Sequence, residues 1–290
     1  MLIIGLDGLE YEFVVRWRCK KFMQKVYGKY DIVGISRLST PILWGSILTG
    51  INVEKHGYDI KAMDEKKGRV DIHKNILVRF LYDKFYKYRA KLPVKDLGIR
   101  RFLTRINEMR NYPGATMPVK LLKQTFLYKL QRRGYKVLAI EVPSYNETLN
   151  DIFRANCPKF MLAPHEAKLG FIQLLLKECK RRVNIVLNSL DEYDLIFVYL
   201  PIPDLIHHVL SLTRHLKFWI FKYYKDIERL ISPLLKYDDL TLILSDHGFS
   251  LKTLDHTNYG FWSLNEDLGW DVKTIYDFHK HILSYFKVIN

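Results

Sequence analysis

The chain has 290 residues, of which 48% are hydrophobic and 27% charged, and it carries a formal net charge of +15. This length suits one large domain with a sizeable core, and the composition excludes an intrinsically disordered chain. No apolar run reaches the 18 residues of a membrane-spanning helix, and the positive charge favours anionic partners such as phosphate esters, nucleic acid or an anionic membrane surface.

The chain begins with a short apolar run, residues 2–7, which predicts a buried β-strand ending at Asp7. No basic segment of the kind that opens a secretory signal precedes the run, so we predict a cytoplasmic protein. Cys19, Cys157 and Cys179 are odd in number and lack metal-ligand spacing, which predicts no disulfide framework.

Residues 38–50 form an apolar stretch that opens with two hydroxyl residues, Ser39 and Thr40, just before Pro41. Proline is favourable in the first turn of a helix, so the stretch predicts a buried helix with both hydroxyls at its N-terminus. A hydroxyl there can cap the helix or take part in chemistry, and the stretch alone leaves both interpretations open.

The segment 61–117 differs from the rest of the chain. Residues 61–110 contain 15 Lys or Arg against 6 Asp or Glu, with many aromatic residues and no strand pattern. We predict a basic, aromatic insertion or cap over one edge of the sheet.

Strand and helix patterns alternate in the rest of the chain. Apolar runs predict further strands, and residues spaced three and four apart predict helices between them. The predicted strands are 136–143, 193–204 and 241–246, and the predicted helices are 118–133, 165–190 and 215–236. This alternation predicts an α/β domain with a mostly parallel sheet.

Acids and histidines gather where the predicted strands end. Each could have an ordinary role alone, as a helix cap, a turn or a surface histidine, but ligands of parallel sheets bind beyond the carboxyl ends of the strands. Aspartate and histidine are preferred ligands of zinc and manganese, and together with the hydroxyl these side chains are enough for two ions. The candidates are Asp7, Thr40, Asp204, His208, Asp246, His247 and His256.

The ordered set of motifs resembles the alkaline phosphatase superfamily, and most closely its type I phosphodiesterase/nucleotide pyrophosphatase branch. The motifs are GLDG near the start, a threonine ten residues before Gly50, His56-Gly57, Asp-x-x-x-His, Asp-His-Gly and a final histidine. They span residues 1–60 and 193–263, and residues 61–135 carry no usable resemblance.

The resemblance implies a single catalytic domain over residues 1–290, with helices on both faces of its central sheet. It also implies two divalent ions, usually zinc and in some members manganese. One ion would be held by Asp7, Asp246, His247 and the oxygen of Thr40, and the other by Asp204, His208 and His256. Thr40 would be the nucleophile and form a covalent phospho-threonine intermediate.

Two departures from the family pattern affect the site. Relatives commonly place proline two residues after the nucleophile, which would select Ser39, whereas the spacing to Trp44 and Gly50 selects Thr40. Leu43 stands where nucleotide-cleaving members often carry an asparagine. The C/S-x-P-x-R signature of sulfatases is absent, and the chain is short for a phosphoglycerate mutase of this superfamily.

We therefore predict a hydrolase of small anionic phosphate esters, a phosphodiesterase or nucleotide pyrophosphatase. The alternatives are a phosphomonoesterase with the same metal site and a non-catalytic protein that binds a polyanion. His207 is an alternative ligand to His208, and Asp255 is a candidate to orient His256.

Overall fold

The structure is a computed structural model that describes residues 1–58, 117–237 and 239–288. The predicted cap at 61–117 lies, apart from Met117, outside the described residues. The cap and the single domain over residues 1–290 therefore stay predictions.

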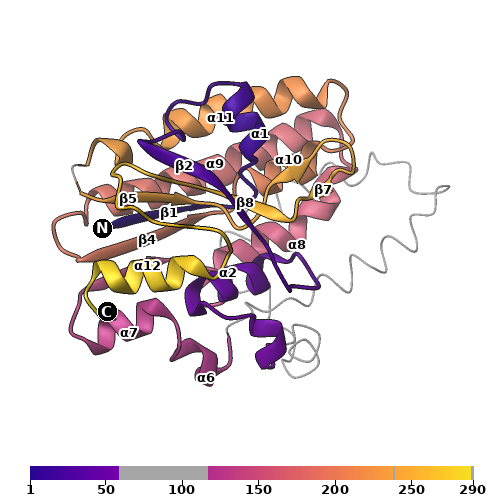
Figure 1. The fold of residues 1–290 in the computed structure, drawn as a ribbon. Coiled ribbons are helices and arrows are strands. Elements are labelled where there is room, and N and C mark those ends of the chain that lie inside the picture. Colours follow the sequence, from indigo (N-terminus) through magenta and orange to yellow (C-terminus); the bar gives the residue numbers. More distant parts are fainter. Residues whose placement is uncertain (59–116, 238, 289–290) are drawn as a thin grey trace.

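The core of the molecule is a six-stranded sheet with the strand order β2-β8-β5-β1-β4-β3 (Figure 1). The pairs β1–β4, β1–β5 and β3–β4 are parallel, while β8 runs antiparallel to both β5 and β2. The predicted mostly parallel sheet is confirmed. Its strands are β1 (Leu2–Leu6), β2 (Val26–Asp31), β3 (Val137–Ile140), β4 (Leu195–Leu200), β5 (Thr241–Leu244) and β8 (Tyr259–Leu264).

Helices cover both faces of this sheet, as expected, and each face has its own cluster of buried apolar side chains (Figure 1). The first face carries α1 (Tyr11–Arg16), α8 (Leu149–Met161), α9 (His165–Leu187), α10 (Asp204–Leu210) and α11 (Leu216–Ile231). The second carries α2 (Thr40–Thr49), α6 (Val119–Leu122), α7 (Phe126–Arg132) and α12 (Asp277–Tyr285).

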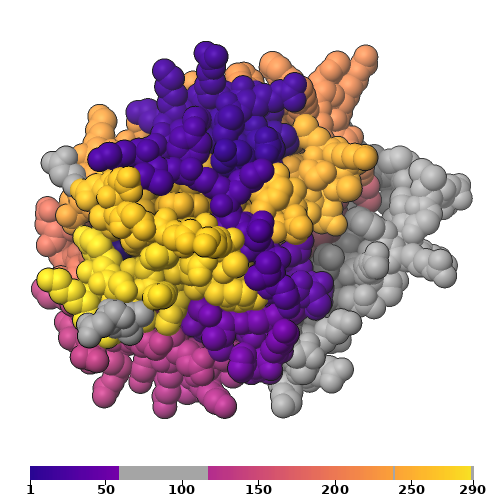
Figure 2. Space-filling model, viewed as in Figure 1, coloured from indigo at the N-terminus to yellow at the C-terminus, as the bar shows by residue number. Residues whose placement is uncertain are grey.

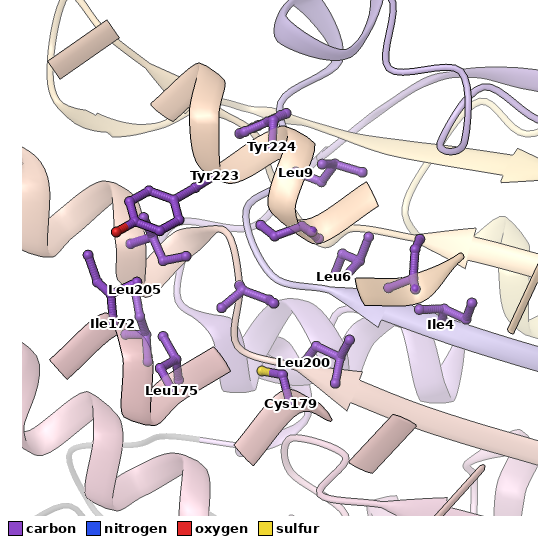
Figure 3. Close-up of a cluster of buried hydrophobic side chains, with 14 of the residues drawn as sticks. Ile4, Leu6, Leu9, Ile172, Leu175, Cys179, Leu200, Leu205, Tyr223 and Tyr224 are labelled. Carbon is purple, nitrogen blue, oxygen red and sulfur yellow. The ribbon is translucent and has the colours of Figure 1, made fainter. Parts of the chain in front are cut away.

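The first strand shows how the sequence fills both clusters. Alternate side chains of a strand point to opposite faces, so Leu2, Ile4 and Leu6 join the cluster under α9 and α11, part of which is drawn in Figure 3. Ile3 joins the other cluster. Gly5 lies under Trp44 of α2, and a Cβ on it would stand 2.9 Å from the indole ring. The absence of a side chain at Gly5 therefore lets α2 pack closely on β1.

The helix predicted at 118–133 is wrong as a single element, because the structure divides it into α6 and α7. Thr125 caps α7: its Oγ1 accepts a hydrogen bond from the Tyr128 backbone N–H at 3.1 Å, so a new helix starts there. The helix predicted at 215–236 ends at Ile231, and a 3-10 turn, Leu234–Lys236, follows Pro233.

Segments far apart in the sequence are neighbours in the sheet, where β2 pairs with β8 over six residue pairs. Figure 2 shows that the N-terminal part of the chain (indigo) and its C-terminal part (yellow) are neighbours on the surface. Within the described residues, no helix is long and apolar enough to cross a membrane. All three cysteines are free and buried.

Candidate metal centre

The predicted ligands lie at the carboxyl edge of the parallel strands. Asp7 follows β1, Asp204 opens α10 after β4, and Asp246 and His247 follow β5 after Ser245. His256 lies in β7 (Asp255–His256), which pairs with β6 (Phe249–Ser250) as a small ribbon beyond β5. Buried apolar runs bring each strand to the same edge, and the first acid after each run is a candidate ligand.

Asp7, Asp246 and His247 form a first ligand group, and all three are at most 1% exposed. His247 Nε2 lies 3.3 Å from Asp7 Oδ1 and 3.7 Å from Asp246 Oδ2. One potential ligand atom from each residue lies within 4.8 Å of the others. This spacing suits a shared cation held by two carboxylates and an imidazole.

Asp204, His208 and His256 form a second ligand group. Asp204 Oδ1 lies 3.3 Å from His208 Nε2 and 3.5 Å from His256 Nε2, and the two Nε2 atoms are 3.1 Å apart. Asp204 and His208 are four residues apart on α10, so they share one side of that helix. The group therefore joins one helix to the ribbon that carries His256.

Backbone carbonyls fix the orientation of two of the three imidazoles. His247 Nδ1 donates to the Gly248 carbonyl, and His256 Nδ1 donates to the Leu38 carbonyl, both at 2.9 Å. A carbonyl only accepts, so Nδ1 carries the proton in each ring and the neutral ring has a free lone pair on Nε2. These Nε2 atoms are the ones that face the carboxylates, as metal-binding histidines require.

The two ligand groups adjoin each other. The rings of His247 and His256 are stacked with their centroids 3.7 Å apart, and the Asp204 backbone N–H donates to the Asp7 carbonyl at 2.9 Å. Two cations held by these groups would be near neighbours.

Burial makes the charges in the centre strongly interdependent. Burial raises the pKa of Asp246 well above its usual range, and the charge of Asp7 adds to this effect. Burial opposes the charged form of Asp204 as well, but His208 and His256 outweigh it and hold the Asp204 pKa well below its usual range. Burial likewise opposes charge on His256, yet Asp204 raises the pKa of that ring to about 9. Carboxylates buried in this way need positive charge beside them.

Four atoms of the centre fit a cation directly, because they are buried and make no hydrogen bond to any described residue. Buried polar atoms in native proteins are almost always bonded, so such a cluster calls for a ligand outside the chain. They are Asp7 Oδ1, Asp204 Oδ1, Asp246 Oδ2 and His247 Nε2. All four belong to the two ligand groups, and the residues present fit divalent metal ions.

The two hydroxyls of the 38–50 stretch follow the residue that holds one ring of the second group. Leu38, whose carbonyl holds His256, directly precedes them. Ser39 is the N-cap residue of α2, although its side chain makes no capping bond and its Oγ is buried without a partner among the described residues. Thr40 is the first residue of α2 and 8% exposed, and no hydrogen bond joins its side chain to a ligand group within the described chain.

The structure separates the alternatives that the sequence left open around the histidines. His207 is fully buried, its ring is stacked on Phe249 with centroids 4.4 Å apart, and it belongs to neither group. Asp255 does not orient the His256 ring: it is exposed and accepts from the His256 backbone N–H, while the ring is held by Leu38.

Sequence reasoning missed the residues that support Asp7. The Tyr199 hydroxyl donates to Asp7 Oδ2, and Arg154 Nη2 donates to the Tyr199 oxygen at 3.0 Å. Tyr199 lies in β4, one strand away from Asp7, so only the strand pairing β1–β4 reveals the contact. The signal in the sequence was a single hydroxyl-bearing side chain within an otherwise apolar strand.

No family model matches the sequence, and no curated protein matches it. Among solved structures, the PH0037 protein from Pyrococcus horikoshii has a TM-score of 0.49 at 12% identity, over 100% of this chain and 97% of that one. Murine ectonucleotide pyrophosphatase/phosphodiesterase 5, an inactive variant in complex with AMP, has a TM-score of 0.45 at 13% identity, over 87% of this chain. Human ectonucleotide pyrophosphatase/phosphodiesterase 5 has a TM-score of 0.41 at 18% identity, over 86% of this chain. This chain spans 58% of the murine chain and 56% of the human one.

Proposed function

We propose that this chain is a metal-dependent hydrolase of phosphate esters in the alkaline phosphatase superfamily, acting as a phosphodiesterase or nucleotide pyrophosphatase. The observation that carries the proposal is the pair of adjoining ligand groups with four buried, unbonded ligand atoms. Bound there, two zinc or manganese ions would lower the pKa of a nucleophilic hydroxyl and stabilise charge on the phosphoryl group.

Thr40 is the proposed nucleophile. Its Oγ loses its proton to solvent and attacks the phosphorus, the bond to the leaving-group oxygen breaks with its electron pair, that oxygen takes up a proton from solvent, and a phospho-threonine results. The free backbone N–H groups in the first turn of α2 and the positive end of the helix face the developing negative charge. Water then attacks the phosphorus, releases the phosphate product and restores the threonine hydroxyl.

The class of activity is tested by metal content and by rates on two synthetic esters. We expect about two divalent ions per purified chain, and faster hydrolysis of bis-p-nitrophenyl phosphate than of p-nitrophenyl phosphate with added zinc or manganese. A strong preference for the monoester would make the chain a phosphomonoesterase. A chain that takes up no divalent ion and hydrolyses neither ester, even with added zinc or manganese, would contradict an enzymatic role.

The nucleophile is tested by comparing Thr40→Ala with Ser39→Ala, because the two hydroxyls are adjacent and only one is expected to attack. Thr40→Ala should lower kcat by on the order of 1,000-fold or more and leave the bound metal in place, while Ser39→Ala keeps most of the activity. The opposite pattern would transfer the role to Ser39. Full activity in both variants would rule out the covalent mechanism.

A further inference from the structure

An aromatic surface lies away from the ligand groups, where the end of α1 meets the start of α11. Trp17, Phe218 and Phe221 line a hollow of about 420 Å3 together with His215 and Lys217. Phe218 is 61% exposed and Phe221 39%, and Leu212, in the connection that leads into α11, is 60% exposed. Trp17, Leu212, Phe218 and Phe221 are called the aromatic surface below.

Trp17 packs partly on the core, on Phe13 and Tyr224, but the two phenylalanines do not belong to the core cluster. Helix α11 packs inward through a separate stripe of Ile220, Tyr224 and Ile227, each fully buried. Phe218 and Phe221 lie on the solvent-facing side of the helix, where polar residues are usual. A group of large apolar side chains exposed to solvent indicates a surface that binds a protein, a membrane or a ligand.

The two segments that carry the aromatic surface are basic, and the nearest acids in the chain, Glu12 and Asp226, lie just beyond them. Residues 13–30 hold six Lys or Arg and no Asp or Glu, and residues 205–225 hold four and again no acid. Arg16, Arg18, Arg214 and Lys217 are exposed and form no ion pair with any described residue. Their charge is free to meet a negatively charged partner.

We propose that the aromatic surface docks on a membrane that contains anionic lipid. Cations around protruding apolar side chains are the pattern that binds such membranes, because the cations meet the headgroups while the apolar groups enter the interface. A second copy of the chain fits poorly, since it would bring two sets of unpaired cations together. Single-stranded nucleic acid would stack on the rings, but Leu212 offers no ring for stacking.

The position of the surface gives the docking a consequence for the candidate centre. Leu212 follows His208 by four residues, and α10 carries His208 directly into the connection before α11. If the proposed function holds, docking through Leu212 and Phe218 therefore puts the helix that carries His208 next to a bilayer whose own lipids contain phosphodiester groups.

Co-sedimentation with vesicles tests the proposal on the full chain. Vesicles of phosphatidylcholine with about one third phosphatidylserine should bind the protein, pure phosphatidylcholine should bind it far less, and added salt should weaken the binding. Leu212→Ser with Phe218→Ser, and separately Arg214→Glu with Lys217→Glu, should each lower the partition coefficient by about tenfold or more.

The matched control changes the same types of residue at the opposite edge of the molecule. Val119→Ser with Lys120→Glu, on α6, replaces a 65% exposed valine and an exposed lysine and should leave binding unchanged (Figure 1). All substituted side chains are exposed, so circular dichroism and thermal unfolding should match the parent protein.

Four results would overturn the proposal. The first two are that the parent protein does not bind anionic vesicles, or that the surface variants bind them as well as the parent does. The third is that the α6 control loses as much binding as the surface variants. The fourth is that the same surface binds single-stranded RNA or a second copy of the chain but not vesicles.

Discussion

Tyr199 stands behind the candidate ligands rather than among them. Its hydroxyl donates to Asp7 Oδ2 and accepts from Arg154, and burial with the nearby charge of Asp7 raises its pKa well above the usual range. The tyrosine therefore stays a neutral donor. One oxygen of Asp7 is held in this way, and the other, Oδ1, is left facing His247.

Tyr199→Phe should weaken metal binding by about 10- to 100-fold, because partners that orient a ligand contribute that much to affinity. Competition with a chromophoric zinc chelator measures the change. Tyr237→Phe is the control: it removes a hydroxyl that donates to the Leu190 carbonyl at 3.1 Å, remote from the centre, and should leave the affinity unchanged. Equal affinities in all three proteins would show that Asp7 needs no such support.

The turn after β1 is the element on which the two ligand groups depend. Gly8 has a positive φ of 69°, and a Cβ on it would stand 2.8 Å from the Cβ of Asp204. Its backbone N–H also points toward Asp246 Oδ1 at 3.5 Å. Glycine at this position lets β1 turn while α10 passes close beside it, so ligands from both groups can meet.

Gly8→Ala should lower the free energy of unfolding by about 2–4 kcal/mol, from backbone strain and from the contact with Asp204 together. Gly134 isolates the strain, because it has a φ of 90° and a Cβ on it would meet nothing within 4 Å. Gly134→Ala should cost about 1 kcal/mol and leave metal binding intact. Urea unfolding and metal titration of both variants measure the difference, and equal effects would remove the special role of Gly8.

Elements with continuous apolar runs could be predicted from the sequence, while those defined by distant partners could not. The buried strands β1, β4 and β5 can be recognised in the sequence because each is an unbroken apolar run. Strand β2 has an alternating, half-exposed pattern interrupted by Gly28, and it becomes a strand by pairing with β8 more than 200 residues later. Helix α8 continues through Pro158, which the sequence would read as a helix end.

At the scale of the whole molecule, the ligand sets could be predicted because parallel strands deliver their ends to one edge. The acids and histidines there stand next to recognisable runs. What the sequence could not supply were contacts between segments with no common motif, such as the Leu38 carbonyl on His256 and the Tyr199 hydroxyl on Asp7. Both depend on how strands and loops far apart in the chain lie in space.

The packing of α12 against α2 and α7 ties the end of the described chain to its beginning. His279 of α12 lies over Gly50, the residue that ends α2, and its Nε2 lies 3.1 Å from Lys129 Nζ of α7. Burial, and then the charge of Lys129, lower the pKa of His279 to about 4. The folded protein therefore keeps this ring neutral at pH values where an unfolded chain protonates it.

Acid should weaken this packing in a defined window. Above pH 6.5 the ring is neutral in both states; as the pH falls from there to about 4, only the unfolded chain gains the proton, so stability is lost. Water reaches part of the half-buried ring, so we expect a loss of about 1 kcal/mol. Urea unfolding from pH 7 to 4 measures this loss of stability.

His279→Gln keeps a donor for the Gln124 carbonyl but cannot titrate, so its stability should fall less steeply with acid than that of the parent protein. Parallel curves for the two proteins would show that His279 has no part in the acid response.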